Sequence, residues 1–248
     1  MTDAERIAEV QRVISAVRDP EIDETAGELD FVVGVEVNEG DVAVSIRLPS
    51  YWCPANFAWL MAQDMRKAVL SLPWATGFRL ELVDHFAEAQ ISRGISQGLA
   101  FEAVFPTHAV GDLTALQRDF ATKAMLMRQA PLIAAIGKSG MDDTAICAAK
   151  IRAFDLLDDA SIAPLWAAVM EKRREAGIAH DAAQPAVCDA AGAAVADLNA
   201  HLREIRRVST SAAASGEMCR MLVAGRRIGV GCTAFAPTNN INKQENAR

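Results

Sequence analysis

The chain contains 248 residues, of which 51% are hydrophobic and 6% aromatic, and its formal net charge at pH 7 is −7. A chain of this length buries about 70–75% of its unfolded surface, so it needs no disulfide or metal merely to fold. The negative charge argues against nonspecific binding to nucleic acid, because neutralising phosphates requires clustered lysine and arginine. No apolar leader and no apolar run of about 18 residues is present, so the sequence predicts a cytoplasmic protein without a membrane span.

Five cysteines are scattered along the chain, which predicts a reduced protein rather than a disulfide scaffold. No CxxC or HxxxH pair occurs, so no self-contained zinc site is expected. Four potential ligands in the second half of the chain are spaced 8, 13 and 18 residues apart: His180, Cys188, His201 and Cys219. Because these spacings do not place ligands on one helical turn, we expect these four residues to be structural.

The first 84 residues predict the order helix, strand, strand, helix, strand. An apolar stripe favours a helix over 3–17 with Asp3 as its cap, and Asp19-Pro20 ends it because a residue before proline avoids the helical conformation. Alternating apolar and polar residues then favour a β-hairpin. The later elements are strands over 29–37 and 41–48, a helix from Pro54 to about Leu72 and a strand over 77–83.

The character of the sequence changes after residue 84. Residues 85–106 are expected to form an irregular extension, to which Phe101–Phe105 adds an edge strand. Beyond residue 112, alanine, leucine and methionine at helical spacing favour four helices, and Pro131 should kink or divide the first of them. These helices are expected over 112–136, 142–158, 161–176 and 181–207. A flexible joint over 209–216 and a short helix or strand over 218–223 follow.

These elements predict an α+β protein. A small α/β sandwich, built from a helix, a β-hairpin, a helix and a strand, occupies residues 1–106. A mostly α-helical domain follows over 112–236, and the polar stretch 237–248 is expected to be a disordered tail.

The junction between the second strand and the second helix is the strongest candidate for chemistry. Pro54 is expected at the first helical position, which places Cys53 at a strand-to-helix turn. A thiol there would feel the positive end of the helix and unpaired backbone N–H groups. Both favour the thiolate, which is the form that binds metal or attacks an electrophile.

Three motifs in this region occur in a known order. They are VRDPEID at 17–23, Glu28-Leu29 before the first strand, and S-x-x-Cys-Pro at 50–54. With the leading helix and the later helix and strand, residues 5–84 resemble the iron–sulfur assembly domain of PaaD and SufT type maturation factors. The chain departs from that pattern in having Asp23 where a proline is usual and the bulky pair Tyr51-Trp52 before the cysteine. The helical extension resembles no family that we can name.

The resemblance implies a non-enzymatic accessory factor for the maturation of a metalloprotein. Cys53 would bind or transfer iron or an iron–sulfur cluster transiently, and Asp19 and Glu21 would belong to the same functional loop. The implied partners are a client metalloprotein and other assembly proteins. A homodimer that pairs Cys53 across two chains would supply a second thiolate.

Other residues around the cysteine are weaker candidates. Tyr51 and Trp52 could cover a bound centre or dock a partner, and we expect Trp52 to be partly exposed because it flanks a turn. His85 and His108 could each approach Cys53 as a second ligand, although histidines at strand ends more often form surface hydrogen bonds.

The sequence also leaves a metal-free interpretation open. The sandwich would then serve as an adaptor or chaperone that steadies a metalloenzyme, such as an oxygenase, during assembly. A thiol enzyme would need a base beside Cys53, and only His85 or His108 could supply one. No phosphate-binding loop, Gly-x-Ser-x-Gly elbow or Ser-His-Asp order is present, so ATP-driven and hydrolase chemistry have no support.

Overall fold

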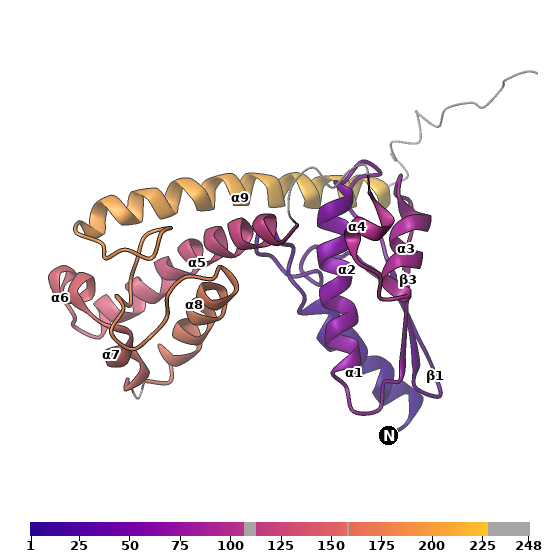
Figure 1. Ribbon diagram of the computed structural model, residues 1–248, viewed down its shortest axis with the longest axis horizontal. Coiled ribbons are helices and arrows are strands. Elements are labelled where there is room, and N and C mark those ends of the chain that lie inside the picture. The colour runs from indigo at the N-terminus through magenta and orange to yellow at the C-terminus, as the bar shows by residue number, and fades with distance from the viewer. Residues whose placement is uncertain (107–112, 158, 228–248) are drawn as a thin grey trace, which may run out of the picture.

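The computed structural model describes residues 1–106, 113–157 and 159–227. Within these residues the chain forms an N-terminal half built on a three-stranded sheet and a second half built from helices (Figure 1). The expected α+β class is therefore confirmed. No helix in the described part of the chain is long and apolar enough to cross a membrane.

The sheet forms because β1 and β2 are joined by a tight turn and β3 returns beside β2. The N-terminal elements are α1 (Asp3–Ser15), β1 (Val32–Asn38), β2 (Asp41–Ile46), α2 (Ala55–Leu70) and β3 (Gly77–Leu82). β1 pairs antiparallel with β2, while β3 pairs parallel to β2 after the α2 crossover. Alternate residues of β2 and β3 are buried in one core: Val42, Val44, Ile46, Phe78, Leu80 and Leu82.

The cap of the first helix lies one residue earlier than predicted. Thr2, not Asp3, occupies the N-cap, and it forms a capping box with Glu5. The Thr2 hydroxyl accepts from the Glu5 backbone N–H at 3.3 Å, while the Glu5 carboxylate accepts from the Thr2 N–H at 2.7 Å. This reciprocal pair satisfies two backbone donors at once, so it is preferred over a single aspartate cap.

The predicted irregular extension and edge strand are wrong. Residues 85–106 contain α3 (Glu88–Ser96) and the short α4 (Phe101–Val104). The hydroxyls of Ser96 and Ser92 accept the backbone N–H groups of Leu80 and Leu82 on β3, both at 2.9 Å. Since α3 satisfies the outer edge of β3, no further strand is needed there.

The second half has its own buried core. Its helices are α5 (Leu113–Lys138), α6 (Asp143–Ala148), α7 (Ile151–Asp155), α8 (Ala163–Glu175) and α9 (Leu198–Arg227). Pro131 lies inside α5 without dividing it. The helix predicted over 142–158 is instead two short helices, since Ala149 and Lys150 are extended between them.

The predicted helix over 181–207 is wrong in its first part, because residues 181–197 form turns and short bridges. In this segment, hydrogen bonds from buried side chains replace the backbone hydrogen bonds of a helix. The Gln129 amide exchanges two hydrogen bonds with the Cys188 backbone, each 3.0 Å, and Arg173 donates to the carbonyl of Pro185 at 2.7 Å. Backbone groups satisfied in this way do not require a helix.

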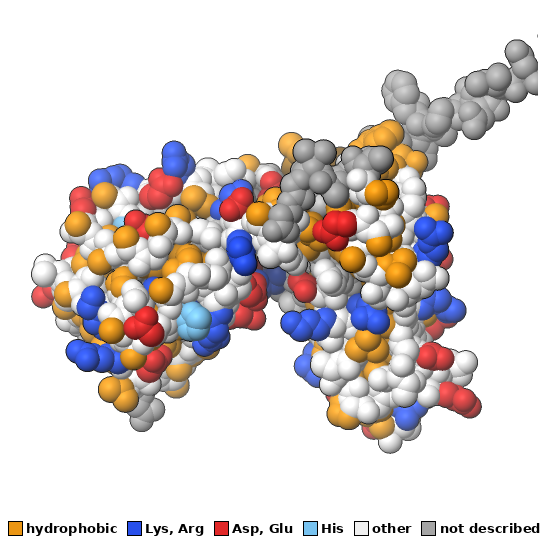
Figure 2. Space-filling view, in the orientation of Figure 1, with side chains coloured by type: hydrophobic (Ala, Val, Ile, Leu, Met, Phe, Trp, Pro, Cys, Tyr) orange, Lys and Arg blue, Asp and Glu red, His pale blue; other side chains and the backbone are white. Residues whose placement is uncertain are grey.

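The long helix α9 connects the two halves, as Figure 1 shows. Its first turns contribute Leu198 and Ile205 to the second core, whereas Cys219 and Val223 near its end pack against the N-terminal core. The flexible joint predicted over 209–216 and the separate element over 218–223 are therefore wrong, because both stretches lie inside α9. On the side away from α9, a deep notch separates the two halves (Figure 2). The tail predicted over 237–248 lies outside the described residues.

Candidate functional site

The turn that carries Cys53 is held by backbone hydrogen bonds. The Cys53 N–H donates to the Ser50 carbonyl at 3.2 Å, and the Trp52 N–H donates to the Ser50 hydroxyl at 3.1 Å. Pro54 is the N-cap of α2 rather than its first helical residue, and its carbonyl accepts the N–H groups of Phe57 and Ala58. Cys53 thus lies just outside the helix start and is half-buried.

His85 secures this turn from the far end of β3. Its Nε2 donates to the Cys53 carbonyl at 2.8 Å, because its Nδ1 accepts the Ala87 backbone N–H at 3.1 Å. The side chain is only 1% exposed, and burial lowers the pKa of the imidazole. Both ring nitrogens are engaged with the backbone, so in this arrangement His85 positions the turn rather than facing the thiol as a ligand.

The environment of the Cys53 thiol differs from the sequence-based expectation. Burial, the largest effect, raises the pKa of Cys53, and the negative charge of Asp19 raises it further. A hydrogen bond from the Ser50 backbone and the positive charge of Arg226 act in the opposite direction. The expected lowering of the pKa is therefore wrong for this thiol, because desolvation outweighs the groups that favour the thiolate.

The loop that follows α1 approaches the cysteine with an acidic residue. The Asp19 carboxylate accepts backbone N–H groups from Glu21 at 2.9 Å and Ile22 at 3.2 Å, which closes the turn at Pro20. Burial nevertheless raises the pKa of Asp19, since desolvation outweighs these two hydrogen bonds. Because the Asp19 charge also acts on the Cys53 thiol, the predicted loop and the cysteine belong to one neighbourhood.

Helix α9 adds residues to this neighbourhood that sequence reasoning missed. Cys219 is half-buried, and its pKa is raised to about 11 by burial first and then by Asp19, Cys53, Glu21 and Glu24. The sequence predicted that Cys219 is structural. The sequence gives no signal that Cys219 belongs here, because Cys53 and Cys219 are more than 160 positions apart in the chain.

Charged residues on α9 anchor it to the loops around the cysteine. Arg220 forms an ion pair with Glu24, and Arg226 donates to the Leu48 carbonyl while its guanidinium lies 3.9 Å from Asp84. These contacts reach both the acidic loop and the end of β2, so α9 closes over the side of the N-terminal half where Cys53 lies.

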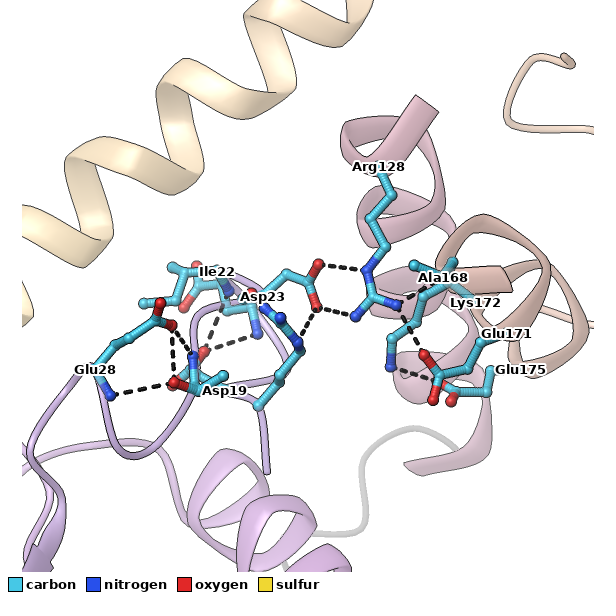
Figure 3. A network of polar contacts seen from close by, with 12 residues as sticks. Asp19, Ile22, Asp23, Glu28, Arg128, Ala168, Glu171, Lys172 and Glu175 are labelled. Atoms are coloured by element: carbon cyan, nitrogen blue, oxygen red, sulfur yellow. Dashed lines mark hydrogen bonds and ion pairs between the residues drawn. The ribbon is translucent and has the colours of Figure 1, made fainter. Parts of the chain in front are cut away.

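A second polar network joins the acidic loop to the helical half (Figure 3). Arg128 of α5 donates to both carboxylate oxygens of Asp23 at 2.8 Å and to Glu171 of α8 at 2.9 Å. The two main partners are well covered, with side-chain exposures of 13% for Arg128 and 11% for Asp23. Asp23 has a φ of 57°, a conformation that aspartate tolerates better than most residues. Asp23 therefore provides, through Arg128, a joint between the two halves.

Aromatic side chains flank the cysteine on the outer surface. Trp52 is 66% exposed and Tyr51 is 38% exposed, and Trp52 stacks on Phe86 with ring centroids 5.9 Å apart. The exposure predicted for Trp52 is thus present. Phe86, which is 41% exposed, was not anticipated, because it lies 34 residues away in the sequence.

Two further expectations concern ligands. His108 lies outside the described residues. Among the residues that the structure describes, no group of three or more His, Cys, Asp or Glu side chains is arranged to hold a metal ion. The neighbourhood of Cys53 therefore offers two thiols and nearby acids rather than a complete coordination shell.

The N-terminal half is similar to a known protein family. Residues 7–77 match the family model described as iron–sulfur cluster assembly protein. The match spans the DPE loop and the Cys-Pro turn, and it confirms the resemblance inferred from those motifs. No curated protein and no solved structure matches the chain. The family suggests a role in iron–sulfur cluster assembly, while α5–α9 lie beyond the matched residues.

Proposed function

We propose that this protein is an accessory factor in metalloprotein maturation, which binds iron or an iron–sulfur cluster through Cys53 and passes it to a client. The observation that carries the proposal is the family match over residues 7–77 together with a half-buried thiol at the Cys-Pro turn inside that match. We further propose that the protein works in the cytoplasm with assembly proteins as partners and performs no catalysis of its own.

The chain's own residues would support transient binding. The raised pKa of Cys53 keeps the free thiol protonated, so binding of the cargo must displace a proton. Arg226 offers a positive charge near the resulting thiolate, while Asp19 offers a nearby carboxylate. A thiolate next to an oxygen donor is a mixed set that suits iron better than a purely soft metal.

The position of the thiol would also affect exchange. His85 fixes the carbonyl of Cys53, so the sulfur is presented from a rigid turn. A cargo held by few protein ligands is displaced easily by a client that supplies a fuller set. In this proposal Asp19 and Glu21 form the functional loop, and Tyr51 and Trp52 form the contact with the client.

The test is a comparison of Cys53→Ser with Cys147→Ser in the original host. Cys147 is half-buried in the helical half and serves as a matched control. We expect loss of client maturation in the first variant and none in the second, together with loss of iron recovered from anaerobically purified Cys53→Ser. Full maturation by Cys53→Ser would overturn the proposal.

A second candidate function is a metal-free adaptor that steadies a metalloenzyme during assembly. The exposed aromatic cluster of Tyr51, Trp52 and Phe86 favours it, because aromatic side chains are enriched at the centres of protein interfaces. Anaerobic reconstitution with iron and sulfide separates the two functions. A colourless protein that still binds its client tightly supports the adaptor, and a coloured protein that loses its centre in Cys53→Ser supports the carrier.

A further inference from the structure

The end of α9 presents a regular face to the N-terminal half. Ala212, Cys219 and Val223 recur at spacings of seven and four residues, and all three pack against the N-terminal core. Residues at such spacings share one face of a helix. Cys219 is thus directed toward the N-terminal half, whereas its neighbours Met218 and Met221 are 64% and 67% exposed.

Close contacts on both sides of Cys219 fix the register of this helix. One turn earlier, Gly216 lies so near Glu24 that a Cβ atom there would come within 2.5 Å of the Glu24 Oε1 atom. Two turns later, Arg226 binds the carbonyl of Leu48 at the end of β2. Cys219 is therefore held over the span between the acidic loop and the strand that leads to Cys53.

The two thiols share their surroundings. Cys53 packs against the same N-terminal core as Cys219. The Asp19 charge raises the pKa of both thiols, and the Cys53 thiol raises the pKa of Cys219. The sequence places Cys53 inside the family match and Cys219 far beyond it, so the second thiol comes from the extension.

We propose that Cys53 and Cys219 form a two-thiol site, in which helix α9 supplies the second sulfur ligand for the iron cargo. This inference rests on the proposed function and deepens it. Each thiol loses its proton to the solvent when it binds, so one metal ion binds with the release of about two protons. Two thiolates hold iron more firmly than one, yet they leave coordination positions that a client's ligands can occupy.

The site assigns a role to the helical extension. Because α9 bridges both cores, the distance between the two sulfurs depends on how the halves are joined. The Arg220–Glu24 and Arg226–Leu48 contacts would hold Cys219 in place. The second sulfur then comes from the same chain, which replaces the paired Cys53 residues of a homodimer.

The direct test uses Co²⁺ alone as a probe, because its thiolate charge-transfer absorption increases with the number of bound sulfurs. The full chain is reduced, freed of metal and titrated anaerobically, together with Cys53→Ser, Cys219→Ser and the control Cys147→Ser. We expect the absorption per bound Co²⁺ to fall to about half in Cys53→Ser and in Cys219→Ser, and proton release to fall from about two to about one. The control should match the unmodified chain.

A second measurement tests proximity independently of metal. Diamide takes two electrons and two protons from a pair of neighbouring thiols and leaves a disulfide. Peptide mapping after brief treatment should recover a Cys53–Cys219 link and show that treated protein no longer binds Co²⁺. Far-ultraviolet circular dichroism of the serine variants checks that α9 remains folded.

The outcomes separate this inference from the proposed function. If Cys53→Ser abolishes maturation while Cys219→Ser keeps full Co²⁺–thiolate absorption, the two-thiol site is wrong and the carrier function stands. Metal-dependent dimerisation of Cys219→Ser with unchanged absorption would likewise overturn the inference, in favour of Cys53 paired across two chains. If neither variant impairs maturation, the proposed function itself fails.

Discussion

The two halves of the molecule use their buried polar groups differently. In the helical half, Gln129 and Arg173 are buried and form hydrogen bonds with the backbone of the segment before α9. In the N-terminal half, Asp19 and Cys53 have pKa values raised by burial and lie near the surface that α9 covers. Groups with perturbed pKa values gather at functional sites more often than groups used for support.

This contrast indicates that the two halves have different roles. The helical half resembles a scaffold, since its polar side chains hold loops in place. Burial also shifts the pKa values of Cys188 and His201 in the helical half, but only the N-terminal half bears the match to the iron–sulfur assembly family. Two connections link the halves, the Arg128–Asp23 network and the end of α9, so the contrast can be tested by changing either.

The largest effect is expected from Arg128→Ala. Removing the guanidinium leaves the Asp23 carboxylate covered and without its main partner, which should lower the free energy of unfolding by about 3 kcal/mol. Urea denaturation measures the loss. Asp23→Asn tests the same contact from the other side, because asparagine tolerates the positive φ of this position.

The double variant shows whether the two residues form one unit. Arg128→Ala combined with Asp23→Asn should destabilise the protein by less than the sum of the single changes. The matched control is Arg220→Ala, whose exposed pair with Glu24 should contribute much less to stability than the Arg128–Asp23 pair. Equal losses from Arg128→Ala and Arg220→Ala would show that the first network is not the main joint.

His85 is the next most sensitive position. His85→Ala leaves the Cys53 carbonyl and the Ala87 N–H without their side-chain partner, so we expect a loss of about 2 kcal/mol in thermal or urea unfolding. The variant should also loosen the turn and speed alkylation of Cys53. An unchanged alkylation rate would contradict a positioning role.

The pH dependence of this contribution has a definite sign. Burial lowers the pKa of His85 below its ordinary value of 6.5, so the unfolded chain takes up the proton first as the pH falls. The contribution is complete above pH 6.5 and is lost progressively below it. His85→Gln should therefore be less sensitive than the unmodified chain to acidification from pH 7 to pH 5, measured as the midpoint of urea unfolding.

Local sequence patterns predicted the sheet and failed where distant residues decide the structure. The hairpin, α2 and β3 follow from apolar periodicity and turn residues, and so does the placement of Cys53 at a strand-to-helix turn. The missed helix α3 is fixed by serines that reach β3, and the turns over 181–197 by Gln129 and Arg173.

The same reasoning explains the site residues that were missed. The composition of residues 209–216 predicts a flexible joint, yet this stretch is helical because α9 packs on both cores. Cys219 and Phe86 approach the cysteine turn only through that packing and through the end of β3. The desolvation that raises the pKa of Cys53 likewise depends on residues that cover it, which no local motif specifies.

A smaller effect is expected at Asp19, where charge and hydrogen bonding can be separated. Asp19→Ala removes the acceptor of two backbone N–H groups and should cost about 1 kcal/mol. Asp19→Asn retains an acceptor oxygen and removes the charge, so at pH 7 it should be at least as stable as the unmodified chain.

The sign at Asp19 follows from its raised pKa. Relative to the unfolded chain, the folded state favours the protonated carboxyl, so this contribution is present below the ordinary pKa of 3.8 and is lost as the pH rises through the folded value. Thermal unfolding of Asp19→Asn and the unmodified chain from pH 3 to pH 7 measures it. A variant that is clearly less stable at pH 7 would show that the charge itself is needed for folding.

The smallest effect on stability is expected at Trp52, where the comparison between the halves becomes a test of function. Its side chain is mostly exposed, stacks on Phe86 and meets Tyr51 edge-on, so Trp52→Ala should change the free energy of unfolding by less than about 1 kcal/mol. The control is Leu156→Ala, since Leu156 is 84% exposed in the helical half. If the aromatic cluster docks a client, Trp52→Ala should weaken client capture from the original host by about tenfold, whereas Leu156→Ala should leave it unchanged. Equal capture by both variants would place the client contact elsewhere and return the aromatic cluster to a covering role over Cys53.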